Sequence, residues 1–230
     1  MDDIKYLKDI YNFHLYHVKS IGSTNTFLKE NYNSFPDNSI LLADIQTNGR
    51  GRYTRKWISN DDYTFSFLFK NNNYHNEILS PLAIVKALKK LDINGFIKWP
   101  NDVYYNNKKL SGILIESVYL GSNIAATIVG IGINKYDKPE VDGIGINKDI
   151  SNINLVSLIT EEYINLIKKD FKDIIDEYIS FSNVINRYIE YQGEIYLAKN
   201  ITDEGHLLIE KDNVIKEIST DEINLKIKIK

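Results

Sequence analysis

The chain has 230 residues, of which 43% are hydrophobic and 26% are charged, as in ordinary globular proteins. It has no cysteine, which excludes disulfides and thiolate metal sites and fits a reducing compartment, and its net charge of -3 gives no general reason to expect nucleic-acid binding. No apolar run approaches the ~20 residues of a membrane-spanning helix and no signal peptide is evident, so we expect a cytoplasmic protein.

The first third of the chain is predicted to place short strands around one short helix. Residues 13–18 are apolar and aromatic. Ser23 or Thr24 is a suitable N-cap for a helix that runs to about Glu30, because a hydroxyl can accept a hydrogen bond from the first turn. Residues 40–43 predict a strand, and aromatic residues at 63, 65, 67 and 69 recur with the period of two that indicates another.

The middle third is predicted to contain a helix followed by several strands. Ser80 and Pro81 favour a helix start, as the cap and the first-turn proline, and an apolar stripe follows as far as Leu91. The strands are expected over residues 96–99, 103–105, 109–118 and 124–133, with a turn at residues 106–108.

The last third is predicted to begin with the longest helix and to end in short strands. Asn154 is expected to cap this helix, whose apolar stripe continues to about Ile179. Short β segments follow over residues 194–198, 206–210 and 213–218, with a final alternation at positions 225, 227 and 229. We therefore expect an α+β fold, with a mixed β-sheet and covering helices over residues 1–183 and a small β-barrel module over residues 184–230.

The segment Gly49–Trp57 is the most informative for function. It contains two glycines, three arginines, a lysine and a tryptophan in the sequence GRGRYTRKW. Glycine lets the backbone come close to a ligand, arginine presents a planar set of donors to phosphate or carboxylate, and an indole can cover a flat ring. These residues predict a loop around a small anion, such as a nucleotide. The alternative is a solvated turn whose arginines pair with acids elsewhere.

Three further motifs carry polar groups that suit a ligand, and each also has an ordinary structural interpretation. Lys98–Asp102 places a cation, an amide and a carboxylate around a proline-fixed bend, which is otherwise a polar tip between two strands. Lys109–Glu116 sets a lysine at the mouth of an apolar strand, either to bridge two anions or as a surface side chain. Gly22–Asn25 offers hydroxyls and amides at a helix start, for a ligand or for capping alone.

Two other kinds of site are not expected. His14 and His17 are three residues apart without a further ligand nearby, so we predict no histidine metal site. No Walker loop is present, so any ATP must be held in another way. The pentapeptide GIGIN occurs at residues 130–134 and 143–147, and we interpret the second copy, in a loop, as coincidental.

Taken in chain order, these motifs resemble those of the biotin protein ligases. The matching segments are Ser23–Asn25, Gln46–Trp57, Lys98–Asp102, Lys109–Leu114 and Gly130–Asn134. The resemblance implies a catalytic core like that of class II aminoacyl-tRNA synthetases, followed by an SH3-like C-terminal domain. It also implies that biotin and MgATP give biotinyl-5′-AMP and pyrophosphate. Biotin then passes to a lysine of a biotin carboxyl carrier protein, for example that of acetyl-CoA carboxylase.

The resemblance further implies roles for individual residues. Those for biotin are Ser23, Thr24, Asn25, Gln46, Gly49, Arg50, Gly51, Arg52, Lys109 and Gly112. Those for ATP and the adenylate are Arg52, Arg55, Trp57, Lys98, Asn101, Lys109, Ile133 and Asn134. The catalytic residues are Lys109, between the biotin carboxylate and the α-phosphate, Arg52, and Asp102, which is expected to hold Mg²⁺ or the incoming lysine.

Some features depart from this pattern or leave alternatives open. Thr54 replaces a common glycine and Gly22 an aspartate, which puts loop geometry in question, and the loop glycines favour ordering on ligand binding. A lipoate protein ligase would share the fold and the adenylation chemistry, and a non-catalytic module would dock a partner through the β tail. The stretch before Ser23 is too short for the helix-turn-helix domain of repressor members, so we expect no DNA binding. The resemblance also suggests a homodimer through sheet edges.

Overall fold

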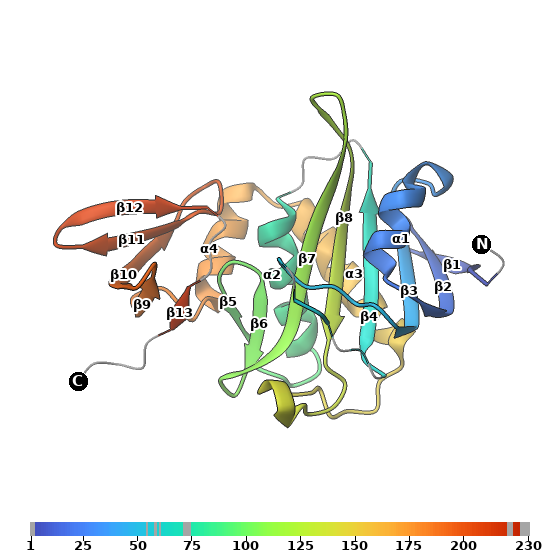
Figure 1. Cartoon of the computed structure of the whole chain (residues 1–230), viewed down its shortest axis with the longest axis horizontal. Helices are drawn as coiled ribbons and strands as arrows, with labels where there is room; N and C mark the ends of the chain where they lie inside the picture. The colour runs from blue at the N-terminus through green and yellow to red at the C-terminus, as the bar shows by residue number, and fades with distance from the viewer. Residues whose placement is uncertain are drawn as a thin grey trace.

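Two β-sheets, with helices packed against the larger one, make up the computed structural model of the chain (Figure 1). The structure describes residues 3–53, 55–57, 59, 61–70, 75–219 and 223–225. Within these residues no helix is long and apolar enough to cross a membrane. The helices are α1 (Thr24–Asn31), α2 (Asn76–Lys89), α3 (Asn152–Ile167) and α4 (Phe171–Phe181), with short 3-10 turns at Tyr32–Ser34 and Pro139–Val141.

The larger sheet has eight strands among the described residues, in the spatial order β1-β2-β3-β4-β8-β7-β6-β5. Neighbouring strands are antiparallel except β2 and β3, which are parallel and are connected through α1. The strand bounds are β1 (Lys5–Ile10), β2 (Phe13–Ile21), β3 (Ser39–Gln46), β4 (Tyr63–Phe69), β5 (Phe96–Lys98), β6 (Asp102–Tyr105), β7 (Lys108–Leu120) and β8 (Asn123–Ile133).

Alternate residues of the central strands enter two different hydrophobic layers. On β3, Ile40 and Leu42 belong to the core that includes α2 and α3. Leu41 and Ala43, between and after them, belong to a second cluster with Leu28 of α1. Because side chains along a strand point to opposite faces, α1 covers one face of the sheet and α2 with α3 covers the other.

The same alternation leaves a hollow on the α1 face. Ile131 and Ile133 of β8 enter the core on the side of α2 and α3. Gly130 and Gly132 therefore face α1, and Gly112 of β7 lies opposite Gly132 in the antiparallel pairing. Glycine replaces a side chain at three adjacent points, so the sheet surface is open there.

The second sheet is antiparallel and has five strands among the described residues, in the order β12-β11-β10-β9-β13. Its core is continuous with that of the larger sheet, since Ile189 and Leu207 belong to the same buried cluster as Leu82 of α2. The Trp99 indole N–H also donates to the Gly205 carbonyl oxygen at 3.0 Å, which connects the KWPND segment to the β10–β11 turn. The strand bounds are β9 (Tyr188–Tyr191), β10 (Glu194–Ile201), β11 (Leu207–Lys211), β12 (Val214–Ile218) and β13 (Asn224–Leu225).

Most of the predicted elements are confirmed, but the predicted start of α2 is wrong. The helix begins at Asn76, four residues before Ser80, and Pro81 lies inside it. The Tyr163 hydroxyl donates to the buried Asn76 side chain and so supports the first turn from α3. A proline near the start of a helix removes only one backbone hydrogen bond, and tertiary packing compensates for it.

The single long helix predicted from Asn154 is also wrong, because it is two helices. Ser151 caps α3, and its hydroxyl accepts a hydrogen bond from the Asn154 N–H at 3.2 Å. The chain then turns at Lys168 and restarts α4 after Asp170. The apolar stripe runs across the break because both helices pack on the same core.

Two strands, β1 at the edge of the larger sheet and β9 in the second sheet, have no predicted counterpart. In β1, only Ile10 is buried, so the strand lacks the apolar alternation that indicates strands. β9 is only four residues long. Positions 227 and 229 of the predicted final alternation lie outside the described residues.

Candidate active site

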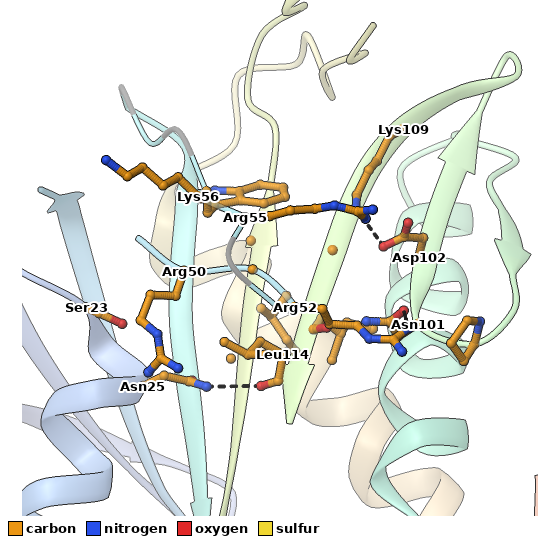
Figure 2. Close-up of a pocket in the computed structure, with 18 of the residues that line it drawn as sticks. Ser23, Asn25, Arg50, Arg52, Arg55, Lys56, Asn101, Asp102, Lys109 and Leu114 are labelled. Atoms are coloured by element: carbon orange, nitrogen blue, oxygen red, sulfur yellow. Dashed lines mark hydrogen bonds and ion pairs between the residues drawn. The ribbon is translucent and has the colours of Figure 1, made fainter. Parts of the chain in front are cut away.

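A cavity of about 280 Å³ opens beside α1, above the glycine hollow of the sheet (Figure 2). The site residues predicted from the sequence all line it except Gly49, Ile133 and Asn134. The charged and polar lining residues are Ser23, Thr24, Asn25, Gln46, Arg50, Arg52, Arg55, Lys56, Lys98, Asn101, Asp102 and Lys109. One carboxylate and six cationic side chains among these residues favour an anionic ligand.

Lys109 and Asp102 form an ion pair at one end of the cavity. The Lys109 Nζ atom lies 2.7 Å from the Asp102 Oδ1 atom, and the side chains are 35% and 21% exposed (Figure 2). Their strands β7 and β6 are hydrogen-bonded neighbours, so the pairing follows from strand register. The carboxylate holds the ammonium group at the cavity wall.

Arg52 and Asn101 lie together beside this ion pair (Figure 2). The Arg52 guanidinium donates to the Asn101 Oδ1 atom at 3.2 Å. The Asn101 amide in turn donates to the Ile113 carbonyl oxygen of β7 at 2.6 Å. Asn101 therefore connects an arginine of the Gly49–Trp57 segment to the sheet.

The Gly49–Trp57 segment is a small hairpin. The Trp57 backbone N–H donates to the Gly49 carbonyl oxygen at 3.0 Å, and the Gly51 N–H donates to the Arg55 carbonyl oxygen at 2.8 Å. The hairpin's three arginines, Arg50, Arg52 and Arg55, all line the cavity. Thr54, the departure from the family pattern, lies outside the described residues.

The Trp57 side chain packs on the glycines of the hollow. A Cβ atom at Gly132 would lie 2.4 Å from the indole, and one at Gly112 would lie 3.1 Å from it. The Lys138 Nζ atom lies 5.6 Å from the indole ring centre, and Lys138 forms a buried ion pair with Asp62. The indole N–H is buried and has no hydrogen-bond acceptor among the described residues.

The opposite end of the cavity is built from uncharged hydrogen-bonding groups. Ser23 caps α1, as predicted, and its hydroxyl accepts from the first turn of the helix. The Thr24 backbone N–H donates to the Gln46 Oε1 atom at 2.7 Å, which joins α1 to the end of β3. Behind them, the buried Ser66 hydroxyl lies 2.6 Å from the Thr24 hydroxyl. This end suits a neutral polar ligand group.

Glu116 is a half-buried carboxylate next to the cavity that the sequence analysis did not assign. Its oxygens accept from the Asn25 amide at 3.2 Å, from the Lys29 ammonium at 3.1 Å and from the Arg50 guanidinium at 3.2 Å. Burial alone would raise the pKa of Glu116, but these hydrogen bonds and the nearby positive charges outweigh it and hold the pKa below its ordinary value. A charged residue inside an apolar strand was the signal available in the sequence.

Lys98 lies on the cavity wall beside a phenol. Its ammonium is 5.3 Å from the ring centre of Tyr104, which also lines the cavity. Burial raises the pKa of Tyr104 to about 12, so the phenol stays protonated under ordinary conditions.

Asn134 and Ile133 support the site from behind. The buried Asn134 amide donates to the Lys109 carbonyl oxygen at 3.0 Å and to the Ile144 carbonyl oxygen at 3.2 Å. Asn134 therefore fixes the backbone that carries Lys109. Ile133 faces the core on the side of α2 and α3.

No group of three or more histidine and acidic side chains that could hold a metal ion occurs in the part of the chain that the structure describes. His14 pairs with Asp9 at 2.7 Å, and His17 pairs with Asp44 at 3.0 Å.

The fold and the cavity define an α+β protein with an arginine-rich hairpin over an open sheet face. The family model described as the biotin/lipoate A/B protein ligase family matches residues 17–134. The match covers half of the chain, from β2 to the GIGIN motif of β8, and includes all of the described residues that line the cavity except Ile223. The chain belongs to the biotin/lipoate A/B protein ligase family.

Relatives and solved structures agree with this assignment. The chain is 26% identical over 233 residues to the bifunctional ligase/repressor BirA of Escherichia coli, covering 90% of this chain and 72% of that protein. It is 29% identical over 189 residues to the biotin–[acetyl-CoA-carboxylase] ligase of Paracoccus denitrificans, covering 74% and 78% of the two chains. The biotin protein ligase of Aquifex aeolicus, solved in complex with biotin and ATP, is similar with a TM-score of 0.74 and 29% identity, over 94% of this chain and 99% of that chain.

Proposed function

We propose that the protein is an ATP-dependent biotin protein ligase. The supporting observation is a single cavity with uncharged hydrogen-bonding groups at Thr24 and Gln46 and a cationic end at Lys109 and Arg52. Biotin has a neutral ureido ring at one end and a carboxylate at the other, which matches this division. The Paracoccus denitrificans relative is a biotin–[acetyl-CoA-carboxylase] ligase by name, and the similar Aquifex aeolicus biotin protein ligase was solved in complex with biotin and ATP.

In the first step, a biotin carboxylate oxygen attacks the α-phosphorus of ATP. The bond from this phosphorus to the oxygen that bridges to the β-phosphate breaks, and pyrophosphate leaves. The two reacting groups are both anionic, so cations are needed where charge builds up. Lys109 and Arg52 supply them, and release from the ion pair with Asp102 lets the Lys109 ammonium bridge the carboxylate and the α-phosphate.

In the second step, the neutral amine of the acceptor lysine attacks the acyl carbonyl of biotinyl-5′-AMP. AMP leaves, and an amide bond forms with loss of a proton. The arginine-rich hairpin covers the mixed anhydride and keeps water away from it until the acceptor arrives. Trp57, packed on Gly112 and Gly132, provides a flat surface for the adenine, and Arg55 and Lys98 face the phosphates.

In the proposed reaction, Mg²⁺ is bound as part of the MgATP substrate. Asp102 is the one carboxylate among the cavity residues that the structure describes, and it pairs with Lys109. Magnesium in nucleotide sites is commonly bound through one or two carboxylates, with phosphates and water completing the shell. Asp102 can supply such a carboxylate, and we assign it to binding Mg²⁺ or the acceptor amine.

We also propose that residues 1–183 form the catalytic domain and residues 184–230 form a small SH3-like domain. The second sheet begins at Tyr188, just after α4 ends at Phe181, which supports a boundary between them. The Trp99–Gly205 hydrogen bond and the position of Ile223 in the cavity lining support a contribution of the C-terminal domain to the site.

The acceptor in this proposal is a biotin carboxyl carrier protein, and the reaction is placed in the cytoplasm. The name of the Paracoccus denitrificans relative supports the carrier of acetyl-CoA carboxylase. The absence of cysteine is compatible with a reducing compartment.

The test is transfer to a purified apo carrier with ATP, Mg²⁺ and either biotin or lipoate. Intact-mass analysis should show one biotinyl addition to the carrier, lost when its acceptor lysine is replaced by arginine. Lipoyl addition in place of biotinyl addition, or no addition with either acid from well-folded protein, would contradict the proposal.

A further inference from the structure

The neutral end of the cavity contains more oxygen contacts than hydroxyl protons. The Thr24 hydroxyl lies 3.0 Å from Gln46 Oε1 and 2.6 Å from the Ser66 hydroxyl, and the Ser66 hydroxyl lies 2.7 Å from Asn25 Oδ1. These are three oxygen–oxygen contacts, but Thr24 and Ser66 together carry only two hydroxyl protons. One of the three contacts therefore contains no hydroxyl proton. Which contact this is determines whether the cavity presents a hydrogen-bond donor or an acceptor to a ligand.

Two acceptors, the Glu116 carboxylate and the Leu114 carbonyl oxygen, together set the direction of this hydrogen-bond chain. An ionised carboxylate only accepts, so the Asn25 amide must turn its nitrogen toward Glu116, at 3.2 Å. The same nitrogen donates to the Leu114 carbonyl oxygen at 3.1 Å (Figure 2). The Asn25 Oδ1 atom consequently faces Ser66, and the Ser66 hydroxyl must donate to it.

The proton-free contact then falls between Thr24 and Gln46. Because the Ser66 proton is used toward Asn25, the Thr24 hydroxyl donates to Ser66 across the 2.6 Å contact. The Thr24–Gln46 contact is the longest of the three at 3.0 Å, and the Gln46 oxygen already accepts from the Thr24 backbone N–H. Two oxygen acceptors are thus left side by side, and both residues line the cavity.

We propose that Glu116 is a positioning residue that, through Asn25 and Ser66, turns the Thr24 hydroxyl proton away from the cavity so that Thr24 and Gln46 present acceptors to a ligand N–H group. Neither Glu116 nor Ser66 lines the cavity, and Ser66 is fully buried. A ureido N–H supplies the missing proton between the two oxygens. The inference rests on the proposed function, because biotin is the ligand that carries this group.

The neighbouring cations keep Glu116 ionised and fixed. Lys29 and Arg50 both donate to it, and Arg50 also donates to the Thr26 hydroxyl at 3.2 Å. The carboxylate therefore has a second effect, since it anchors the arginine-rich hairpin to β7. Ser66→Ala separates the two effects, because it interrupts the hydrogen-bond chain and leaves the Arg50 anchor in place.

The experiment measures the Kd of biotin and of a cyclic carbamate analogue, in which oxygen replaces one ureido N–H, by calorimetry on the full chain. Wild-type protein should prefer biotin by about tenfold or more, because the analogue leaves the two acceptors without a proton. In Glu116→Gln and Ser66→Ala this preference should fall several-fold, since the Thr24 hydroxyl can then turn toward the cavity. Glu177→Gln removes a carboxylate that is likewise paired with two cationic side chains, Lys86 and Lys169, but lies on α4, and it should leave the preference unchanged.

A general structural role would weaken both ligands equally and leave their ratio unchanged. An unchanged ratio in both Glu116→Gln and Ser66→Ala, with normal biotin binding to wild type, would overturn the inference alone. No biotin binding to the well-folded wild-type protein would overturn the inference together with the proposed function. Either variant suffices for the comparison if the other does not fold, as judged by its thermal unfolding transition.

Discussion

Gly132 lies directly beneath the Trp57 indole, with no room for even one additional carbon between them. A Cβ atom at this position would approach the ring to 2.4 Å, far inside any real contact. Two residues earlier on the same strand face, a Cβ atom at Gly130 would approach the Asn25 side chain to 2.3 Å. The GIGIN motif thus holds two ends of the cavity open with two glycines of one strand.

Alanine at Gly130 and alanine at Gly132 should weaken the binding of different substrates. Gly132→Ala displaces the indole and should raise the Kd of ATP by about tenfold or more, with a smaller effect on biotin. Gly130→Ala displaces the Asn25 amide and should weaken biotin more than ATP. Calorimetric titration of each variant with each ligand checks both expectations.

Gly130→Ala and Gly132→Ala are controls for each other, because each adds one carbon to the same strand at a different end of the cavity. If both variants weakened both ligands to the same extent, the glycines would matter for general stability and not for the separate ends of the cavity.

Replacing Lys109 should slow adenylate formation. Lys109→Ala removes a charge that acts where negative charge develops in the transition state, so single-turnover formation of the adenylate should fall about 10²- to 10³-fold. Rapid-quench measurement with radiolabelled ATP gives the rate directly. Lys108→Ala is the matched control, since Lys108 is adjacent, 49% exposed and paired with Asp142 outside the cavity. Near-normal single-turnover rates in Lys109→Ala would show that its assigned role is wrong.

Replacing Arg52 should affect retention of the adenylate more than capture of ATP. The guanidinium is positioned through Asn101 at the cavity, where in the proposed mechanism it covers the intermediate. Arg52→Ala should raise the release rate of biotinyl-5′-AMP by more than the Kd of ATP, and we expect about tenfold or more for release. Filter-binding dissociation of the labelled adenylate is the measurement. Equal losses for ATP and for the adenylate would contradict a covering role.

Glu116 should contribute stability that acid removes. Its folded-state pKa is lowered below the ordinary 4.5, so its contribution is present above that value and is lost as pH falls through the lower folded pKa. Glu116→Gln should reduce the free energy of unfolding by about 1–3 kcal/mol near neutral pH. The difference from wild type should shrink below about pH 4.5. Urea unfolding of both proteins across this range is the check, and a difference that stays constant with pH would contradict it.

The central strands and the loop motifs could be predicted from the sequence because their signals are local. The aromatic alternation of β4 and the turn at Asn106–Asn107 are present in consecutive residues, and the structure has both. The resemblance predicted that one cavity would bring together the hairpin, Lys98–Asp102 and Lys109. Their spacing along the chain does not show that they are close in space.

The parts that sequence analysis missed depend on contacts between distant residues. Asn76 begins α2 because Tyr163 binds its side chain, which no local propensity shows. Glu116 and Ser66 each interrupt an apolar strand, but their partner Asn25 lies more than 40 residues away from either along the chain. Asn134 was expected at the ligand, and the structure places it on the backbone of Lys109 instead.

Pyrophosphate release from MgATP by the purified protein, with biotin or with lipoate as the acid, tests the central claim most directly. We predict release that depends on biotin and is absent with lipoate. Release with lipoate but not with biotin, or no release with either from well-folded protein, would contradict it.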